Sequence, residues 1–131
     1  MTEKTRTQPQ QILALVNDLF FMLKIEDTAK HLGWPIRFAS TVPEFLERLQ
    51  EARPSLVIAD LTIGGEDLAA LFHQLHASPL QVTSPILGYT THADWKRTGP
   101  LHDKCTTVVT KDTLSRSLPT LMQQLMRPDE A

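Results

Sequence analysis

Leu56-Val57-Ile58-Ala59-Asp60 is a run of four apolar residues that ends in an aspartate. A short, continuous apolar run of this kind is typical of a strand that is buried on both faces, as in a parallel sheet covered by helices. An earlier stretch, Ile12-Leu13-Ala14-Leu15-Val16, has the same character and is followed by Asn17 and Asp18. The two runs predict two parallel strands with polar residues at their carboxyl ends.

The segments around these runs alternate between helical and strand patterns. In residues 19–32 apolar side chains recur at helical spacing, and Gly33 follows as a C-cap. Residues 41–44, Thr-Val-Pro-Glu, form a capping box with a proline in the first turn of a second helix. The remaining pattern predicts three further strands, at 35–39, 85–89 and 106–110. It also predicts three further helices, at 68–75, 93–102 and 114–125. The second of these is interrupted at Gly99-Pro100, and the third has Pro119 in its first turn or at a kink.

A strand followed by a helix, repeated five times, is the signature of βαβ units. Their right-handed crossovers place helices on both faces of one parallel sheet, which predicts a three-layer α/β/α domain. The chain of 131 residues suits one such domain at residues 11–126, preceded by a disordered lead-in at 1–10 and followed by a charged tail at 127–131.

Composition narrows the class of protein. The net charge of −2 argues against a nucleic-acid partner, and no apolar run approaches the roughly 18 residues of a membrane span. Cys105 is the only cysteine, which excludes an internal disulfide framework and a multi-cysteine zinc site. A cytoplasmic protein with no membrane partner is therefore expected.

Polar residues gather at the predicted strand ends: Asn17 and Asp18, then Asp60, Thr90 and Lys111. In open α/β sheets, ligands bind outside the carboxyl ends of the strands, so these side chains are expected to converge. Two carboxylates with backbone or water oxygens suit Mg²⁺. An aspartate can accept a phosphoryl group as an acyl phosphate, while a metal ion, an ammonium and a hydroxyl neutralise the phosphoryl oxygens.

With these residues in place, the sequence from 11 to 126 resembles the receiver domains of bacterial response regulators, in their single-domain, chemotaxis-type form. The resemblance implies a flavodoxin-like sheet of five strands in the order 2-1-3-4-5. It also implies that Asp60 is the phospho-acceptor, that Thr90 is the switch residue and that Lys111 is the lysine of the site. Mg²⁺ would be held weakly, at millimolar affinity, by Asp18, Asp60, the backbone carbonyl of Thr62 and, through water, Asn17.

The function implied by the resemblance is signalling rather than enzymatic. A histidine kinase or a phosphotransfer protein would donate a phosphoryl group to Asp60, and the modified domain would bind a downstream protein. Four positions depart from the family pattern: Asn17 replaces an acid, Gly64 and Asp112 replace prolines, and Val108 replaces an aromatic residue. These departures leave an alternative open, a phosphorylation-independent pseudo-receiver that acts as a protein–protein interaction module.

For several other residues an ordinary structural role is better supported by the sequence than a functional one. His73 and His76 are expected on the polar face of a helix, and Cys105 is expected to pack. Trp95 is a candidate partner contact. A flavin or dinucleotide site is disfavoured because Asn17-Asp18 follows the first strand where a glycine-rich phosphate cradle would be needed.

Overall fold

The computed structural model describes residues 11–51, 53–63, 68–73 and 84–126. The elements along the chain are β1 (Ile12–Leu15), α1 (Leu19–Leu32), β2 (Ile36–Ala39), α2 (Val42–Glu51), β3 (Leu56–Asp60), β4 (Ile86–Thr90), α4 (Gly99–His102), β5 (Thr107–Thr110) and α5 (Lys111–Leu125), and residues 68–73 are also helical. The expected lead-in at 1–10, the tail at 127–131, the Gly64-Gly65 turn and His76 lie outside the described residues.

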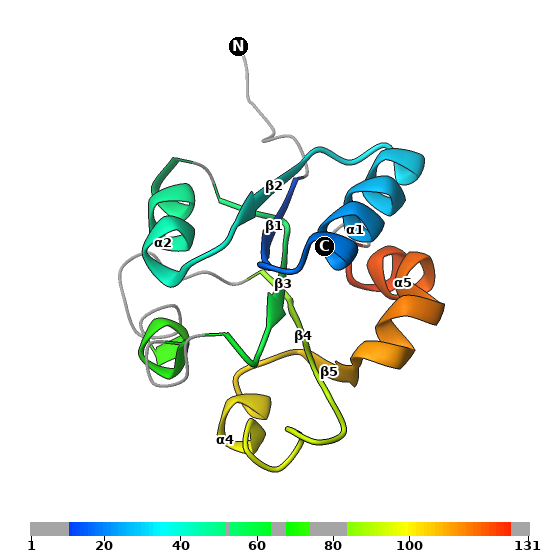
Figure 1. The fold of residues 1–131 in the computed structure, drawn as a ribbon. Helices are drawn as coiled ribbons and strands as arrows, with labels where there is room; N and C mark the ends of the chain where they lie inside the picture. The colour runs from blue at the N-terminus through cyan, green and yellow to red at the C-terminus, as the bar shows by residue number, and fades with distance from the viewer. Residues whose placement is uncertain (1–10, 52, 64–67, 74–83, 127–131) are drawn as a thin grey trace.

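The strands form one parallel sheet of five in the order β2-β1-β3-β4-β5. This order and the alternation of strands with helices confirm the predicted three-layer, flavodoxin-like fold. Figure 1 shows α1 and α5 side by side on one face of the sheet, with α2 and α4 on the opposite face. The central strands β1 and β3 are buried along their whole length, as their continuous apolar sequences predict.

The core is divided by the sheet into two apolar clusters. The α1/α5 cluster consists of Ile12, Ala14, Val16, Phe21, Ile25, Ala29, Leu56, Ile58, Leu87, Tyr89, Leu114, Leu118, Met122 and Met126. The α2/α4 cluster consists of Leu13, Leu15, Ala39, Phe45, Leu49, Val57, Ala59, Leu61, Leu68, Leu71, Phe72, Ile86 and Leu101. Successive residues of a strand point to opposite faces, so each central strand contributes alternately to the two clusters.

The helix termini follow the local signals of the sequence. Gly33 ends α1 in the left-handed conformation, with φ of 82°, where a residue with a Cβ would be strained. At the start of α2, the Glu44 backbone N–H donates to Thr41 Oγ1 at 3.2 Å. The Glu44 carboxylate in turn accepts from the Ser40 N–H at 2.8 Å, one residue before the capping threonine. The predicted capping box therefore forms, with its return bond moved by one residue.

Two helices of the structure differ from those that the sequence pattern predicts. The helix expected at 93–102 is wrong, because residues 92–98 form turns and only Gly99–His102 is helical. Pro100 has no N–H to donate and is tolerated in the first turn, so Gly99-Pro100 begins this short helix. The last helix starts at Lys111 rather than 114, directly after β5. It is kinked at Ser117, two residues before Pro119, which confirms the expected effect of the proline.

None of the helices in the described part of the chain combines the length and the apolar character needed to cross a membrane.

Gly88 on β4 provides a test of how tightly the α2/α4 face is packed. A Cβ at this position would lie 2.9 Å from Cys105 Sγ and 3.0 Å from a methyl group of Leu61. Overpacking of a core commonly costs about 1–3 kcal/mol, so Gly88→Ala is expected to lower the free energy of unfolding by that amount in urea denaturation.

Gly99→Ala is the matched control, because its Cβ would meet nothing within 4 Å. It should leave stability unchanged or slightly raised. Adding Cys105→Ala to Gly88→Ala should restore part of the loss, since Sγ is the closest atom. Wild-type stability in Gly88→Ala would show that this face is loosely packed.

Candidate functional site

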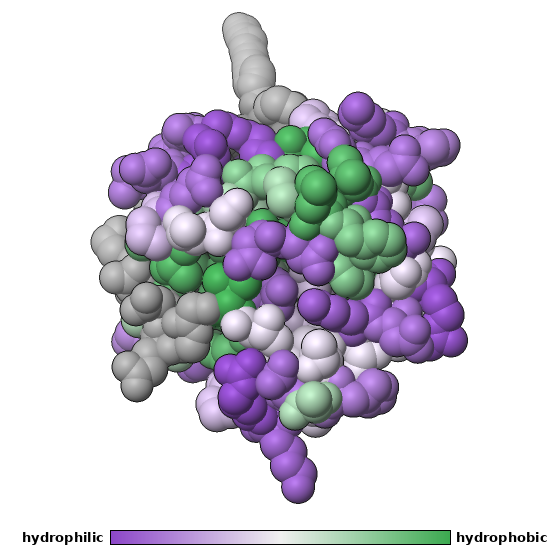
Figure 2. Space-filling model, viewed as in Figure 1, coloured by the Kyte–Doolittle hydropathy of each residue, from purple (hydrophilic) through white to green (hydrophobic). Residues whose placement is uncertain are grey.

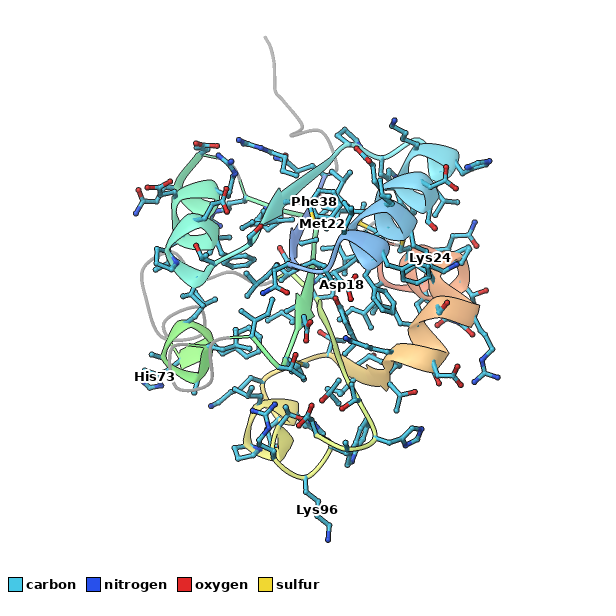
Figure 3. All side chains as sticks on the ribbon, viewed as in Figure 1. Asp18, Met22, Lys24, Phe38, His73 and Lys96 are labelled. Carbon is cyan, nitrogen blue, oxygen red and sulfur yellow. The ribbon has the colours of Figure 1, made fainter. Side chains whose placement is uncertain are left out.

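The polar residues identified in the sequence lie at the carboxyl edge of the sheet, as the parallel topology requires. Asp60 is the last residue of β3 and Thr90 is the last residue of β4. Asn17 and Asp18 follow β1, and Lys111 follows β5 as the first residue of α5. Figure 3 shows Asp18 near the centre of the view, where α1 begins beside the ends of the central strands.

Asp60 is almost completely buried, with 3% of its surface exposed, and one of its two carboxylate oxygens is held by its own turn. Oδ1 accepts the backbone N–H of Thr62 at 2.9 Å and the Thr62 hydroxyl at 2.7 Å. Oδ2 receives no hydrogen bond from any residue that the structure describes, and it is not among the fully enclosed polar atoms of those residues. The turn therefore orients the carboxylate and leaves Oδ2 available to an incoming group.

Asp18 has a structural role as well as a place at the edge. Its backbone is extended, and its Oδ1 accepts the N–H of Phe21 at 3.3 Å, so it is the N-cap of α1. Asn17, directly before it, is exposed. The cap uses Oδ1 of Asp18, as the Thr62 turn uses Oδ1 of Asp60.

These oxygen donors fit a hard cation that keeps much of its water. The described residues contain no group of three or more His, Cys, Asp or Glu side chains placed to hold a metal ion. Mg²⁺ commonly takes only one or two carboxylates and completes its shell with water, so a pair formed by Asp18 and Asp60 suits it. Zinc and other ions that need several His or Cys ligands do not match this edge.

Thr90 is fully buried and hydrogen-bonds away from Asp60. Its Oγ1 lies 3.2 Å from the hydroxyl of Thr98, which is itself only 2% exposed. The Thr98 hydroxyl also lies 2.9 Å from the carbonyl oxygen of Asp94 and 3.1 Å from Nε2 of His102. The His102 ring meets the ring of Trp95 edge to face, with centroids 4.7 Å apart. Thr90 is thus linked through Thr98 to a histidine–tryptophan pair on the α4 side.

The turn that carries Thr98 is held by Asp94. Its carboxylate accepts from Arg97 Nε at 3.0 Å and from the Thr91 hydroxyl at 2.9 Å. These two hydrogen bonds, with the charges of Arg97 and Lys111, lower the pKa of Asp94 below its ordinary value. The turn after β4 is therefore organised around an ionised carboxylate.

Lys111 lies at the expected edge, but its ammonium does not pair with either carboxylate. Its Nζ lies over the ring of Phe21, 5.5 Å from the centroid, which is a cation–π contact. Within the described ranges it forms no ion pair with Asp18 or Asp60. The structure therefore brings Asp18, Asp60 and Thr90 to one edge and leaves Lys111 beside them, on the Phe21 side.

Two polar residues at this edge were missed by the sequence analysis. Tyr89, one residue before Thr90, is fully buried and stacks on Phe21 with ring centroids 5.4 Å apart. A strand alternates its faces, and this alternation could have placed Tyr89 on the same face as Asp60. Thr98 had no signal of its own, because it lies in the segment predicted as a helix at 93–102.

The remaining candidates have structural roles or lie elsewhere. Burial raises the pKa of the Cys105 thiol to about 12, so it is a packing residue, as expected, rather than a nucleophile. His73 is exposed on the helical segment 68–73, far from Asp18 in Figure 3. Trp95 is 40% exposed beside α4.

No protein-family model and no curated protein sequence matches this chain. Solved structures do match. The chemotaxis response regulator CheY4 of Vibrio cholerae is 18% identical, with a TM-score of 0.76 over 90% of this chain and 99% of that one. The signal receiver domain of a histidine kinase from Syntrophus aciditrophicus is 19% identical, with a TM-score of 0.76 over 93% of this chain and 96% of that one.

The phosphorylated cyanobacterial phytochrome response regulator RcpA is 14% identical, with a TM-score of 0.73 over 92% of this chain and 96% of that one. At these identities the likeness establishes the fold. It agrees with the parallel sheet of order β2-β1-β3-β4-β5. The fold of this chain is that of a response regulator receiver domain.

Proposed function

We propose that this chain is a receiver of two-component signalling that accepts a phosphoryl group on Asp60 and signals by binding a partner protein. The observation that carries the proposal is the arrangement of the Asp60 carboxylate. Thr62 donates twice to Oδ1, and Oδ2 has no donor among the described residues. A carboxylate that is oriented through one oxygen and open at the other is prepared to act as a nucleophile.

The donor would be a phosphohistidine of a histidine kinase or of a phosphotransfer protein. Oδ2 of Asp60 forms the new P–O bond while the P–N bond to the histidine breaks, and the freed nitrogen keeps the electron pair and takes up a proton. Asp18, Asp60 and the Thr62 carbonyl, with Asn17 through water, would hold Mg²⁺, which neutralises phosphoryl oxygens when it is bound. Lys111 adds a positive charge at the same edge.

A surface beside the site supports a protein as the donor. Three apolar residues of α1, Leu19, Phe20 and Leu23, are 57–67% exposed directly after Asp18. Figure 2 shows apolar surface over this part of the molecule, bordered by hydrophilic side chains. Exposed apolar patches with polar rims are typical of protein–protein contact, and a phosphohistidine must be delivered next to Asp18 and Asp60.

The contacts of Thr90 suggest how the modification would be transmitted. The Thr98 hydroxyl is placed to donate either to Thr90 Oγ1 or to the Asp94 carbonyl oxygen, and it has one hydrogen. A carbonyl oxygen only accepts, so when Thr98 donates to Asp94, Thr90 can donate its own hydrogen to Thr98. A phosphoryl group on Asp60 offers three strong acceptor oxygens that compete for the Thr90 hydrogen. Loss of the Thr90–Thr98 bond would release the turn that carries Trp95 and the His102 contact.

A phosphorylation-independent pseudo-receiver is the second candidate. The position of Lys111 favours it, because the ammonium contacts the Phe21 ring instead of pairing with Asp60. Asn17 removes one of the charges that would attract a metal ion. In that case the fold serves as an interaction module, and its partner affinity does not depend on Asp60.

The first prediction separates the two candidates. Incubation with Mg²⁺ and a small acyl phosphate is expected to add the mass of one phosphoryl group to the wild type, measured by intact-protein mass spectrometry. Asp60→Asn should show no adduct, because the amide has no carboxylate oxygen to attack. A wild type without adduct, or an adduct that persists in Asp60→Asn, would contradict phosphorylation at this residue.

The second prediction concerns Mg²⁺. The ion is expected to raise the melting temperature, and ligand stabilisation of RT ln(1 + [L]/Kd) reaches about 1 kcal/mol only at several times Kd, so millimolar concentrations are needed. Asn17→Asp should enlarge the shift by adding a third negative charge to the edge. Asp18→Asn should abolish the shift while keeping the α1 cap, since Asn and Asp cap equally well.

Asp18→Ala should abolish the Mg²⁺ shift and also lower the melting temperature without Mg²⁺, because it removes the cap. Glu47→Ala, on the exposed face of α2, is the carboxylate control and should keep the full shift. If neither the wild type nor Asn17→Asp responds to Mg²⁺, the edge is not a metal site and the pseudo-receiver takes precedence.

The third prediction uses the two tryptophans of the chain, Trp34 and Trp95. With Trp34→Phe as background, phosphorylation of Asp60 is expected to change the emission of Trp95, because the Thr98–His102 contact is released. Thr98→Val keeps the shape of the side chain and removes its hydrogen bonds. Thr98→Val should still take up the phosphoryl group but show no change in Trp95 emission on phosphorylation. If its Trp95 emission changes as much as it does in the protein that keeps Thr98, transmission through Thr98 is ruled out.

A further inference from the structure

The hydroxyl of Tyr89 has no role in the fold. The side chain is fully buried, and its phenolic oxygen is the only enclosed side-chain polar atom without a hydrogen-bond partner in the described part of the chain. A buried hydroxyl that lacks a partner destabilises a folded chain, and phenylalanine would occupy the same space without that cost. The ring accounts for the packing on Phe21, and the hydroxyl therefore needs a different explanation.

The sheet register places Tyr89 beside the proposed acceptor, Asp60. Tyr89 of β4 is paired with Asp60 of β3. Paired residues of neighbouring parallel strands project to the same face, and Asp60 lies two residues after Ile58, which belongs to the α1/α5 cluster with Tyr89. Both side chains therefore stand on the face covered by α1 and α5, at the carboxyl edge.

Phe21 holds the phenol on the side of the carboxylates. Its ring lies against that of Tyr89 with an interplanar angle of 31°, and its backbone N–H is bound by Asp18. Burial, followed by the negative charges of Asp60 and Asp18, raises the pKa of Tyr89 far above its ordinary value. The hydroxyl therefore keeps its proton, and it can donate a hydrogen bond when an acceptor is present.

We propose that the Tyr89 hydroxyl donates a hydrogen bond to the phosphoryl group when Asp60 carries it. This proposal rests on the function proposed above and adds a binding residue to that site. An acyl phosphate on Asp60 brings acceptor oxygens to the edge where the phenol lacks one. Tyr89 and Thr90 then contact the modified Asp60 from the two faces of β4, Tyr89 from the α1/α5 side and Thr90 from the α2/α4 side.

Tyr89→Phe tests the proposal because it should keep or raise the melting temperature while it weakens binding of a phosphoryl mimic. Without a phosphoryl group, the variant should melt at a temperature equal to that of the wild type or higher by roughly 2 to 5 °C, since an unpaired polar atom is removed. In the presence of Mg²⁺, it should bind the phosphoryl mimic beryllium trifluoride at least about tenfold more weakly, measured by calorimetry, because a hydrogen bond to an anion is lost.

Trp34→Phe is the matched control for a change of aromatic side chain. Trp34 packs against the same α1/α5 cluster as Tyr89, but it follows the end of α1, whereas Asp18 caps the start of that helix. The variant leaves the rings of Tyr89 and Phe21 intact, so it should bind the mimic as the wild type does. An equal loss of affinity in Trp34→Phe and Tyr89→Phe would show that cluster packing, rather than the hydroxyl, sets the affinity, and would overturn the proposal.

The failure of this proposal is distinguishable from the failure of the proposed function. A wild type that does not bind the mimic would defeat the proposed function itself. A wild type that binds it, together with a Tyr89→Phe variant that binds it equally well, would overturn only the role of the hydroxyl.

Discussion

β3, Leu56–Asp60, runs through the middle of the sheet with β1 and β4 on its sides and helices over both of its faces. A strand in this position has no solvent side, so a charged residue is tolerated only where the strand ends. Asp60 occupies that end, and Thr62 in the following turn donates to it twice. The same constraint places Asp18 after β1 and Thr90 at the end of β4, so these polar side chains lie at the carboxyl edge of the sheet.

The alternation of side chains along β4 divides this edge into two sides. Tyr89 faces α1 and α5 and packs on Phe21, while Thr90 faces the opposite cluster and bonds to Thr98. Two adjacent residues therefore link the end of β4 to two different parts of the molecule. The proposed transmission uses the Thr90 side, because the turn after β4 is held by a few polar contacts to Asp94 rather than by a regular helix.

The charges of the side chains at the carboxyl edge determine how strongly this edge attracts a cation or an anion. With Asn17 neutral, Asp18 and Asp60 provide the negative charge, and their attraction for a divalent ion is correspondingly modest. Lys111 has a cation–π contact with Phe21, an interaction that is weak at exposed positions and easily exchanged for an ion pair with a bound anion. Phe21 therefore connects the cap of α1, the ring of Tyr89 and the ammonium of Lys111.

The sequence by itself determined the architecture. A strand that is buried on both faces has a continuous apolar sequence, whereas in a helix the apolar residues recur every three to four positions, so the two elements can be told apart. It also identified Asp18, Asp60, Thr90 and Lys111 at strand ends. It failed at 93–102, where local pattern could not distinguish a helix from turns held by Asp94. The tertiary structure alone decided the partners of these groups: the link from Thr90 to Thr98, the place of Lys111 over Phe21 and the unpaired hydroxyl of Tyr89. Hydrogen bonds and ring contacts depend on distances between elements far apart in the chain, and such distances are set by packing rather than by local sequence.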